Sequence, residues 1–258
     1  MKVENDVLAV LSRAETNGCS LTLTGHLDRK LYERTNKVLE AAGGKWNKKA
    51  KTHAFSIDAA DCMEQIILTG EVDCAKSSKS VAQLYGFFPT PPAVASRVLI
   101  AAEIRPGMKV LEPSAGTGGL AYHCAAAGAV VDCYEIQQGN AALMAMGAPV
   151  PLGRTQVADF LQIEPAADYD RVVMNPPFAK QDDIRHVMHA LRFLKPTGKL
   201  AAVMSAGVQF RDNKMTTDFR KLVAERGGSI EALPEGAFMD SGTGVRTVLV
   251  TIPAAALA

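Results

Sequence analysis

The sequence lacks the features that would place the chain in a membrane or around a structural metal ion. No apolar run approaches the roughly 20 residues that a membrane helix needs, and residues 1–6 lack the apolar stretch of a signal peptide. The five cysteines are widely spaced and form no Cys-x-x-Cys pair, so we expect neither a zinc site nor a disulfide framework. These absences favour a protein of the reducing cytoplasm.

An excess of charge of either sign is also missing. In 258 residues, 28 lysines and arginines face 27 aspartates and glutamates, which gives a formal net charge of +1. Taken alone, this balance gives no argument for a polyanionic partner. The charges are segregated, however: residues 25–53 hold eight basic and three acidic residues, and residues 180–226 hold ten basic and five acidic residues. Each segment carries an excess of five positive charges, so the near-zero net charge does not exclude a polyanionic partner.

Polar residues divide the chain near residue 80. The stretch at residues 75–80 is the best linker candidate, so we expect a small N-terminal α/β module over residues 1–80 and a second domain over residues 81–258. In the second domain strands and helices alternate, which is typical of a mostly parallel α/β sheet. We expect strands at 109–112, 130–134, 155–158, 169–174 and 199–205, helices at 92–102, 119–127, 138–146, 182–194 and 215–226, and an antiparallel pair at 230–238 and 245–252.

The first chemical signal is a loop of small residues between an expected strand and a helix. It reads Glu112-Pro113-Ser114-Ala115-Gly116-Thr117-Gly118-Gly119, and its glycines permit a ligand to approach the main chain closely. About 20 residues later the next strand ends in Glu135, an offset that suits hydrogen bonds to ribose hydroxyls. A tight β–α connection without a ligand is the plain alternative. The loop is not G-x-G-x-x-G, which argues against a nicotinamide dinucleotide.

The second signal is Asn175-Pro176-Pro177-Phe178, directly after a buried strand. The prolines fix the backbone and cannot donate hydrogen bonds. The Asn175 side-chain oxygen and the Pro176 carbonyl can therefore both accept hydrogen bonds, and two such acceptors would orient an exocyclic amine. Phe178 supplies an aromatic face for a planar base.

Together, the two motifs resemble the class I S-adenosylmethionine-dependent amino-methyltransferases with an N-P-P-F/Y motif, in particular the DNA adenine-N6 methyltransferases. The resemblance covers roughly residues 85–252. It implies a Rossmann-like domain with a mostly parallel seven-stranded sheet and a C-terminal antiparallel hairpin. It also implies S-adenosyl-L-methionine as cofactor and direct in-line methyl transfer without a covalent enzyme intermediate. The implied site residues are Asn175, Pro176, Pro177 and Phe178 at the target base, and Phe88, Thr90, Glu112, Pro113, Ser114, Ala115, Gly116, Gly118, Glu135, Ile136, Asp159, Phe160 and Asn175 at the cofactor.

Two weaker segments fit the same family. Phe87-Phe88-Pro89-Thr90-Pro91 resembles the F-x-T-P segment that closes over the methionine end of the cofactor, although it would also serve as a plain helix entry. Ala158-Asp159-Phe160 resembles the acid and apolar residue beside the cofactor adenine, although Asp159 could be a mere helix cap.

The family includes enzymes that methylate adenine in DNA, adenine or guanine in RNA, cytosine N4, or glutamine in proteins. The F-x-T-P segment and the Glu112–Gly118 loop favour DNA adenine. A base amino-methyltransferase acting on ribosomal or transfer RNA is the first alternative, and a catalytically silent nucleic-acid-binding protein is the second. Only 56 residues separate Gly119 from Asn175, so no large target-recognition domain is inserted there. That compactness suggests an orphan or mobile-element enzyme.

The N-terminal module is a candidate nucleic-acid-binding module. Basic side chains contact phosphates without reading sequence, and here they cluster around Trp46, the single tryptophan. The alternative is a solvated turn whose tryptophan anchors a small core. His186 and His189 share a helix face without an obvious further ligand, so we expect no metal site and two surface side chains. The expected nucleic-acid contacts are Lys45, Trp46, Lys48, Lys49 and Lys51.

Overall fold

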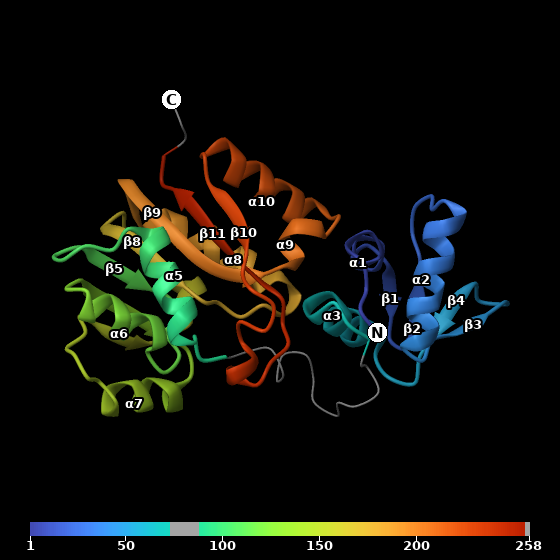
Figure 1. Ribbon diagram of the computed structural model, residues 1–258, viewed down its shortest axis with the longest axis horizontal. Helices are drawn as coiled ribbons and strands as arrows, with labels where there is room; N and C mark the ends of the chain where they lie inside the picture. The colour runs from blue at the N-terminus through green and yellow to red at the C-terminus, as the bar shows by residue number, and fades with distance from the viewer. Residues whose placement is uncertain (73–87, 256–258) are drawn as a thin grey trace. The chain divides into compact units, whose positions relative to one another are not determined.

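The structure is a computed structural model that describes residues 1–72 and 88–255 (Figure 1). The linker expected at residues 75–80 lies outside these ranges. The chain folds into two compact units. The sequence predicts that residues 81–258 form one domain, but a segment within this range belongs to the first unit instead. The first unit comprises Met1–Gly86 and Ala206–Asp218, and the second comprises Phe87–Ser205 and Phe219–Ala258.

The first unit contains a four-stranded antiparallel sheet and several helices. Its strand order is β1-β2-β4-β3, so β3 is an edge strand that pairs with β4. Two helices begin at aspartate caps, because Asp28 accepts a hydrogen bond from the Leu31 N–H and Asp58 accepts one from the Asp61 N–H. The elements are α1 (Asn5–Ser12), β1 (Glu15–Asn17), β2 (Ser20–Thr22), α2 (Arg29–Ala41), β3 (Lys45–Asn47), β4 (Thr52–Ala54), α3 (Ala59–Thr69) and α9 (Gly207–Phe210).

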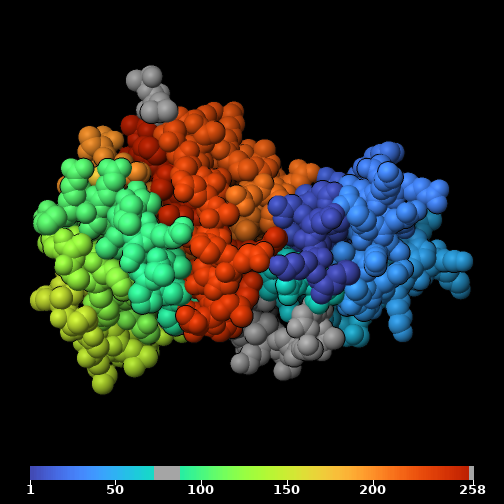
Figure 2. All heavy atoms as spheres, viewed as in Figure 1, coloured from blue at the N-terminus to red at the C-terminus, as the bar shows by residue number. Residues whose placement is uncertain are grey.

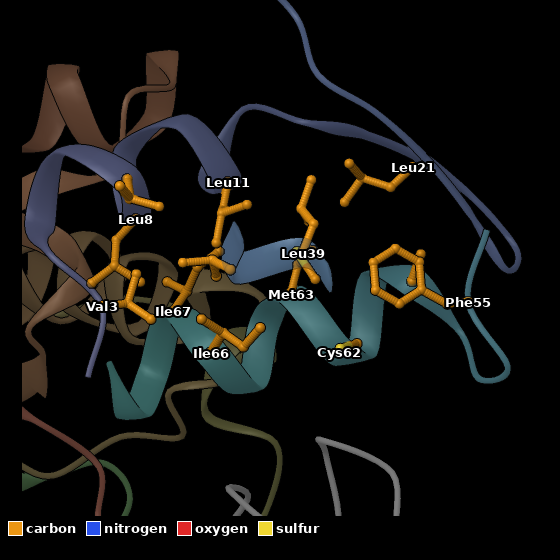
Figure 3. Packing of buried hydrophobic residues seen from close by; sticks show 13 residues of the cluster. Val3, Leu8, Leu11, Leu21, Leu39, Phe55, Cys62, Met63, Ile66 and Ile67 are labelled. Atoms are coloured by element: carbon orange, nitrogen blue, oxygen red, sulfur yellow. The ribbon is translucent and has the colours of Figure 1, made fainter. Parts of the chain in front are cut away.

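A hydrophobic core holds the first unit together. Figure 3 shows the leucines of α1 facing the isoleucines of α3, with Leu39 of α2 and Phe55 beside them. Phe210 of α9 packs against the same cluster, which explains why the internal segment belongs to this unit. Gly44 follows α2 where a Cβ atom would lie 2.7 Å from the Phe55 ring, so the packing requires glycine there.

The second unit is built on a seven-stranded sheet with the order β10-β11-β9-β8-β5-β6-β7. Strands β5 to β9 run parallel, while β11 is antiparallel to both β9 and β10. The mostly parallel sheet with a C-terminal antiparallel hairpin is therefore confirmed. Its strands are β5 (Lys109–Glu112), β6 (Val130–Glu135), β7 (Thr155–Val157), β8 (Tyr169–Met174), β9 (Leu194–Ser205), β10 (Ser229–Ala232) and β11 (Thr247–Pro253).

The strand order reverses next to β5. Strands β6 and β7 follow on one side of β5, and strands β8 and β9 follow on its other side. Because crossovers between parallel strands are right-handed, α6 and α8 lie on opposite faces of the sheet. Ligands of such sheets bind outside the carboxyl ends of the strands at this reversal. The helices are α5 (Pro92–Ala102), α6 (Gly119–Ala126), α7 (Gln138–Met146), α8 (Asp182–Ala190) and α10 (Lys214–Glu225), with the short 3-10 helices η2 (Phe160–Gln162), η3 (Ala179–Gln181), η4 (Leu191–Phe193) and η5 (Met239–Ser241).

Membrane and metal features are absent from the residues that the structure describes. No helix among them is long and apolar enough to cross a membrane, and they contain no group of three His, Cys, Asp or Glu side chains that could hold a metal ion. Cys19, Cys124 and Cys133 are free. Cys62 is disulfide-bonded, so one cysteine takes part in a disulfide although the sequence predicts no disulfide framework.

Candidate active site

Three sequence motifs meet at the carboxyl ends of β5 and β8. Leu111 of β5 pairs with Val172 of β8 in parallel register, so the loops that follow both strands lie at the same edge of the sheet. The segment before α5 joins them there. The three segments enclose a small cavity lined by Phe88, Pro89, Thr90, Glu112, Ser114, Ala115, Thr117, Gly119 and Asn175.

The loop between β5 and α6 depends on glycine. Gly116 and Gly118 both have left-handed backbone angles, with φ of 56° and 91°, which favour glycine strongly. A Cβ atom on Gly118 would also lie 2.5 Å from the Tyr122 ring. The Gly118 N–H closes the turn by donating to the Ala115 carbonyl at 2.8 Å. The loop therefore holds its main chain against the cavity with few side-chain atoms in between.

Glu135 ties this loop to the end of β6. Its buried carboxylate accepts the Gly116 N–H at 2.7 Å on Oε2 and the Gln137 N–H at 2.8 Å on Oε1. Asn140 Nδ2 lies 3.5 Å from Oε1. Each carboxylate oxygen keeps further acceptor capacity, so the predicted hydrogen bonds to ribose hydroxyls are chemically possible. They stay a prediction.

Glu112 places a buried carboxyl group at the wall of the cavity. The Ala121 N–H donates to it, while its Oε2 has no hydrogen-bond partner among the described residues. Burial raises the pKa of Glu112 well above its usual value, and the neighbouring Glu135 carboxylate adds to this rise. A cationic ligand group would supply the missing partner and favour the ionised form.

Asn175 presents an unpaired acceptor in the same cavity. Its Nδ2 donates to the Phe88 carbonyl at 3.2 Å and to Thr90 Oγ1 at 3.1 Å. Because a carbonyl oxygen can only accept, these contacts turn the NH₂ group toward Phe88 and Thr90 and the oxygen away from them. The Asn175 Oδ1 is buried without a hydrogen-bond partner among the described residues. Such an atom calls for a donor from a ligand.

Phe178 does not offer an open face to a base. Its side chain is 2% exposed, so the stacking role predicted for it requires neighbouring side chains to move. Lys180 and Gln181 follow with left-handed φ angles of 55° and 62°, which is uncommon for two successive residues other than glycine. Strained backbone of this kind clusters at ligand clamps and switch regions.

The segment after β7 carries the predicted contacts to the cofactor adenine. Asp159 is exposed and caps η2 by accepting the Leu161 N–H at 3.0 Å, so the cap that the sequence left as an alternative is present. Ile136, beside Glu135, is 64% exposed and offers apolar surface. Phe160 is buried. Its role at the adenine, like that of Asp159, stays a prediction.

An aromatic cluster around Phe160 contains two histidines that the sequence did not assign to the site. The rings of His186 and His189 lie 6.1 Å and 4.8 Å from the Phe160 ring, and His186 Nδ1 is 3.3 Å from Ser114 Oγ. Burial lowers the pKa of His186, which favours the neutral ring. Both histidines are partly exposed, but their rings pack against Phe160, so they are less open to solvent than the expected surface residues.

The basic residues predicted to contact nucleic acid belong to the first unit. Trp46 is on β3 and is 47% exposed. Lys45 is on the same strand, and the other three lysines are in or beside the turn to β4. All four lysines are exposed.

Comparison with known proteins identifies the second unit. Residues 91–228, more than half of the chain, match the family model of the methyltransferase small domain. No curated protein sequence matches the chain.

Solved methyltransferase structures share the fold. The methyltransferase subunit of a type I restriction-modification system from Streptococcus thermophilus is 22% identical, with a TM-score of 0.54, over 67% of this chain and 47% of the subunit. A dimethyladenosine transferase from Plasmodium falciparum is 14% identical, with a TM-score of 0.51, over 65% of this chain and 63% of that one. The 23S rRNA methyltransferase ErmE is 22% identical, with a TM-score of 0.51, over 65% of this chain and 69% of that one. The chain thus spans about half of the first of these proteins.

The residues at the carboxyl edge fit S-adenosylmethionine. Glu112 could pair with a cationic group of this cofactor, Glu135 has acceptor capacity for its ribose, and the glycine loop allows close approach of the main chain. The chain belongs to the methyltransferase small domain family, and its second unit has the Rossmann-like fold of class I methyltransferases.

Proposed function

We propose that the chain methylates the exocyclic N6 amine of adenine in DNA. The observation that carries this proposal is the buried Asn175 Oδ1, which has no hydrogen-bond partner among the described residues although the amide is held by Phe88 and Thr90. An exocyclic amine supplies the N–H that this oxygen lacks.

The residues of the chain would act by holding the amine rather than by removing its proton first. S-adenosylmethionine supplies a methyl group on a positively charged sulfur. Asn175 Oδ1 and the Pro176 carbonyl accept the two N–H groups and favour a more tetrahedral nitrogen, whose lone pair then points at the methyl carbon. The new N–C bond would form as the C–S bond breaks, with its electron pair left on sulfur. The amine then loses one proton to water, so no strong general base is required.

The target base has to leave the DNA stack to reach Asn175. Base-modifying enzymes extrude the base or act on a single strand. Phe178 is buried, so its ring becomes available to the base when the adjoining turn rearranges. The left-handed Lys180 and Gln181 mark the segment in which that movement is proposed, because release of their backbone strain would favour it.

The choice of DNA rests on the F-x-T-P segment and on the Glu112–Gly118 loop. A methyltransferase subunit of a type I restriction-modification system has a similar fold. RNA is the second candidate, because ErmE, with a comparable TM-score, is a 23S rRNA methyltransferase. The intact Asn175–Phe178 motif argues against a catalytically silent binding protein.

A substrate panel tests the proposal. Purified protein is incubated with labelled S-adenosylmethionine and with duplex DNA, single-stranded DNA or RNA of the same sequence, and the products are digested to nucleosides. We expect the label in N6-methyldeoxyadenosine. Asn175→Ala should lower kcat by about 10²- to 10³-fold, as for other transition-state hydrogen bonds. Thr90→Val keeps the Asn175 oxygen and should cost only about 2- to 12-fold, the value of one ordinary hydrogen bond.

Each other outcome contradicts a specific part of the proposal. Label in RNA alone supports the RNA alternative, and label in N4-methylcytosine contradicts adenine as the target. DNA binding without methyl transfer by both the wild-type chain and Asn175→Ala would support the silent binding protein.

A further inference from the structure

The β3–β4 hairpin of the first unit presents an ordered basic tip. Figure 1 shows it extending away from the helices of its unit, and Figure 2 shows the same segment in light blue as a protrusion. Asn47 Oδ1 accepts the N–H groups of Lys49 and Ala50 at 3.0 and 3.1 Å, which forms an Asx turn. The three residues of β3 and those of the turn are all exposed. The lysines therefore project from a fixed turn.

Four lysines of the first unit are close together at this tip, whereas the arginines of α2 are ion-paired. On α2, Arg29 forms an ion pair with Glu33, and Arg34 forms ion pairs with Glu4 and Asp6. These arginines are thus neutralised locally. Within the part of the chain that the structure describes, no ion pair joins the hairpin lysines to an acid. Those lysines are Lys45, Lys48, Lys49 and Lys51.

Trp46 lies among these lysines and is backed by a fixed ring. It stands opposite His53 in the β3–β4 register, with ring centroids 5.0 Å apart. His53 is 1% exposed, and its Nε2 is 2.7 Å from Asn36 Oδ1. Because that oxygen can only accept, Nε2 carries the proton. Burial lowers the pKa of His53, which favours the neutral form of the ring that supports the indole.

Trp46 is not a core anchor of the first unit. It is absent from the hydrophobic cluster of that unit, and 47% of its surface is exposed. Tryptophan is enriched at interfaces, where its large apolar ring contacts a partner. The alternative of a tryptophan that anchors a small core is therefore disfavoured.

We propose that the β3–β4 hairpin is a second nucleic-acid-binding site, which holds a strand with unpaired bases. A base stacks on the exposed face of Trp46, while Lys48, Lys49 and Lys51 contact the phosphates. Both faces of a base in a duplex are covered by its neighbours, so stacking on an indole selects unpaired nucleotides. The site lies outside the family match at residues 91–228, and it does not require methyl transfer.

Trp46 is the single tryptophan of the chain, so its fluorescence reports on this site alone. The full chain is titrated with oligothymidylate, which has no exocyclic amine and cannot be a substrate of the proposed reaction. We expect saturable quenching that weakens with salt. Trp46→Ala should reduce affinity about 5- to 150-fold, the range for loss of one base–aromatic stack, as measured by anisotropy of a labelled oligonucleotide. Trp46→Phe should retain part of the affinity.

A charge-matched pair of triple variants tests the phosphate contacts. The triple Lys→Ala change at Lys48, Lys49 and Lys51 should lower the slope of log K against log salt by about 2, because each single-strand phosphate contact contributes about 0.7. The control removes three exposed cations that are already ion-paired, and its slope should match that of the wild-type chain. The control residues are Arg29, Lys214 and Lys221, all changed to Ala.

Several outcomes would overturn the inference. These are absent quenching, equal loss of slope in both triple variants, tighter binding of duplex than of single strand without quenching, or equal quenching by oligoglutamate. A wild-type chain that methylates DNA but does not bind oligothymidylate would reject this site and leave the proposed function standing. A wild-type chain that binds oligothymidylate but methylates no nucleic acid would reject the proposed function and leave this site standing.

Discussion

Replacing Glu112 with glutamine should stabilise the ligand-free chain at neutral pH and weaken its binding of S-adenosylmethionine. Burial raises the pKa of Glu112, and its Oε2 has no hydrogen-bond partner among the described residues. The folded chain therefore keeps a proton on this group at pH values at which the unfolded chain has released it. Glutamine keeps the shape of the side chain and removes the titration.

The size of the effect follows from proton linkage. The stability that the protonated Glu112 contributes is complete below the unfolded pKa of about 4.3, and it is lost as the pH rises through the raised folded pKa. Within this window, each pH unit lowers the unfolding free energy of the wild-type chain by about 1.4 kcal/mol relative to Glu112→Gln. For a chain of this size, that corresponds to about 3–6 °C in Tm per pH unit.

Thermal unfolding of both proteins between about pH 5 and pH 8 measures this difference. Calorimetric titration with S-adenosylmethionine supplies the second readout. The ammonium and sulfonium groups of this ligand favour the ionised carboxyl group, so affinity should rise with pH in the wild-type chain and stay flat in Glu112→Gln. A stability difference that does not change with pH across this window would refute the reasoning.

Two further changes probe the two units separately. Glu135→Gln would turn an NH₂ group toward the N–H of Gly116 or Gln137, and the resulting unpaired donors should weaken S-adenosylmethionine binding more than tenfold in calorimetry; a change within twofold would contradict this. Arg211→Met removes the 2.7 Å ion pair with Glu64, whose side chain is only 13% exposed, and should cost about 3–5 kcal/mol in denaturant unfolding. A loss below about 1 kcal/mol would place the pair among ordinary surface pairs.

Elements with strong local signals were predicted closely. The sequence placed β5, β8, α5 and α7 at the residues where the structure has them, because each is an apolar strand or an amphipathic segment bounded by turn residues or proline. The short N-terminal helix α1 was missed, since residues 5–12 carry no cap or glycine that marks them.

Boundaries that depend on tertiary pairing were predicted less well. β9 begins at Leu194 rather than at residue 199, because Leu194 pairs with Tyr169 across an irregular register and the Pro196–Gly198 stretch reads as a turn in the sequence. The expected strand at 230–238 ends at Ala232. Pro234 follows closely and lacks the N–H that a longer ladder would need.

The sequence predicted which residues belong to the candidate site, but not the contacts between them. The sequence placed Glu112, Glu135 and Asn175 at strand ends, and parallel topology then brings those ends together. It could not show that the Asn175 amide is held by Phe88 and Thr90, which are more than 80 residues away in the chain. It also predicted an accessible Phe178, whereas packing buries that ring.

The internal segment at residues 206–218 makes the first unit discontinuous in the sequence. The chain leaves the methyltransferase unit after β9, contributes Phe210 to the core of the first unit, and returns within α10. Residues 1–72 alone therefore do not make up the whole of this unit. Joining residues 1–72 to another methyltransferase would leave their core open beside Phe210, so the two stretches had to be acquired or altered together. A change that removes residues 206–218 therefore also removes part of the packing of the first unit.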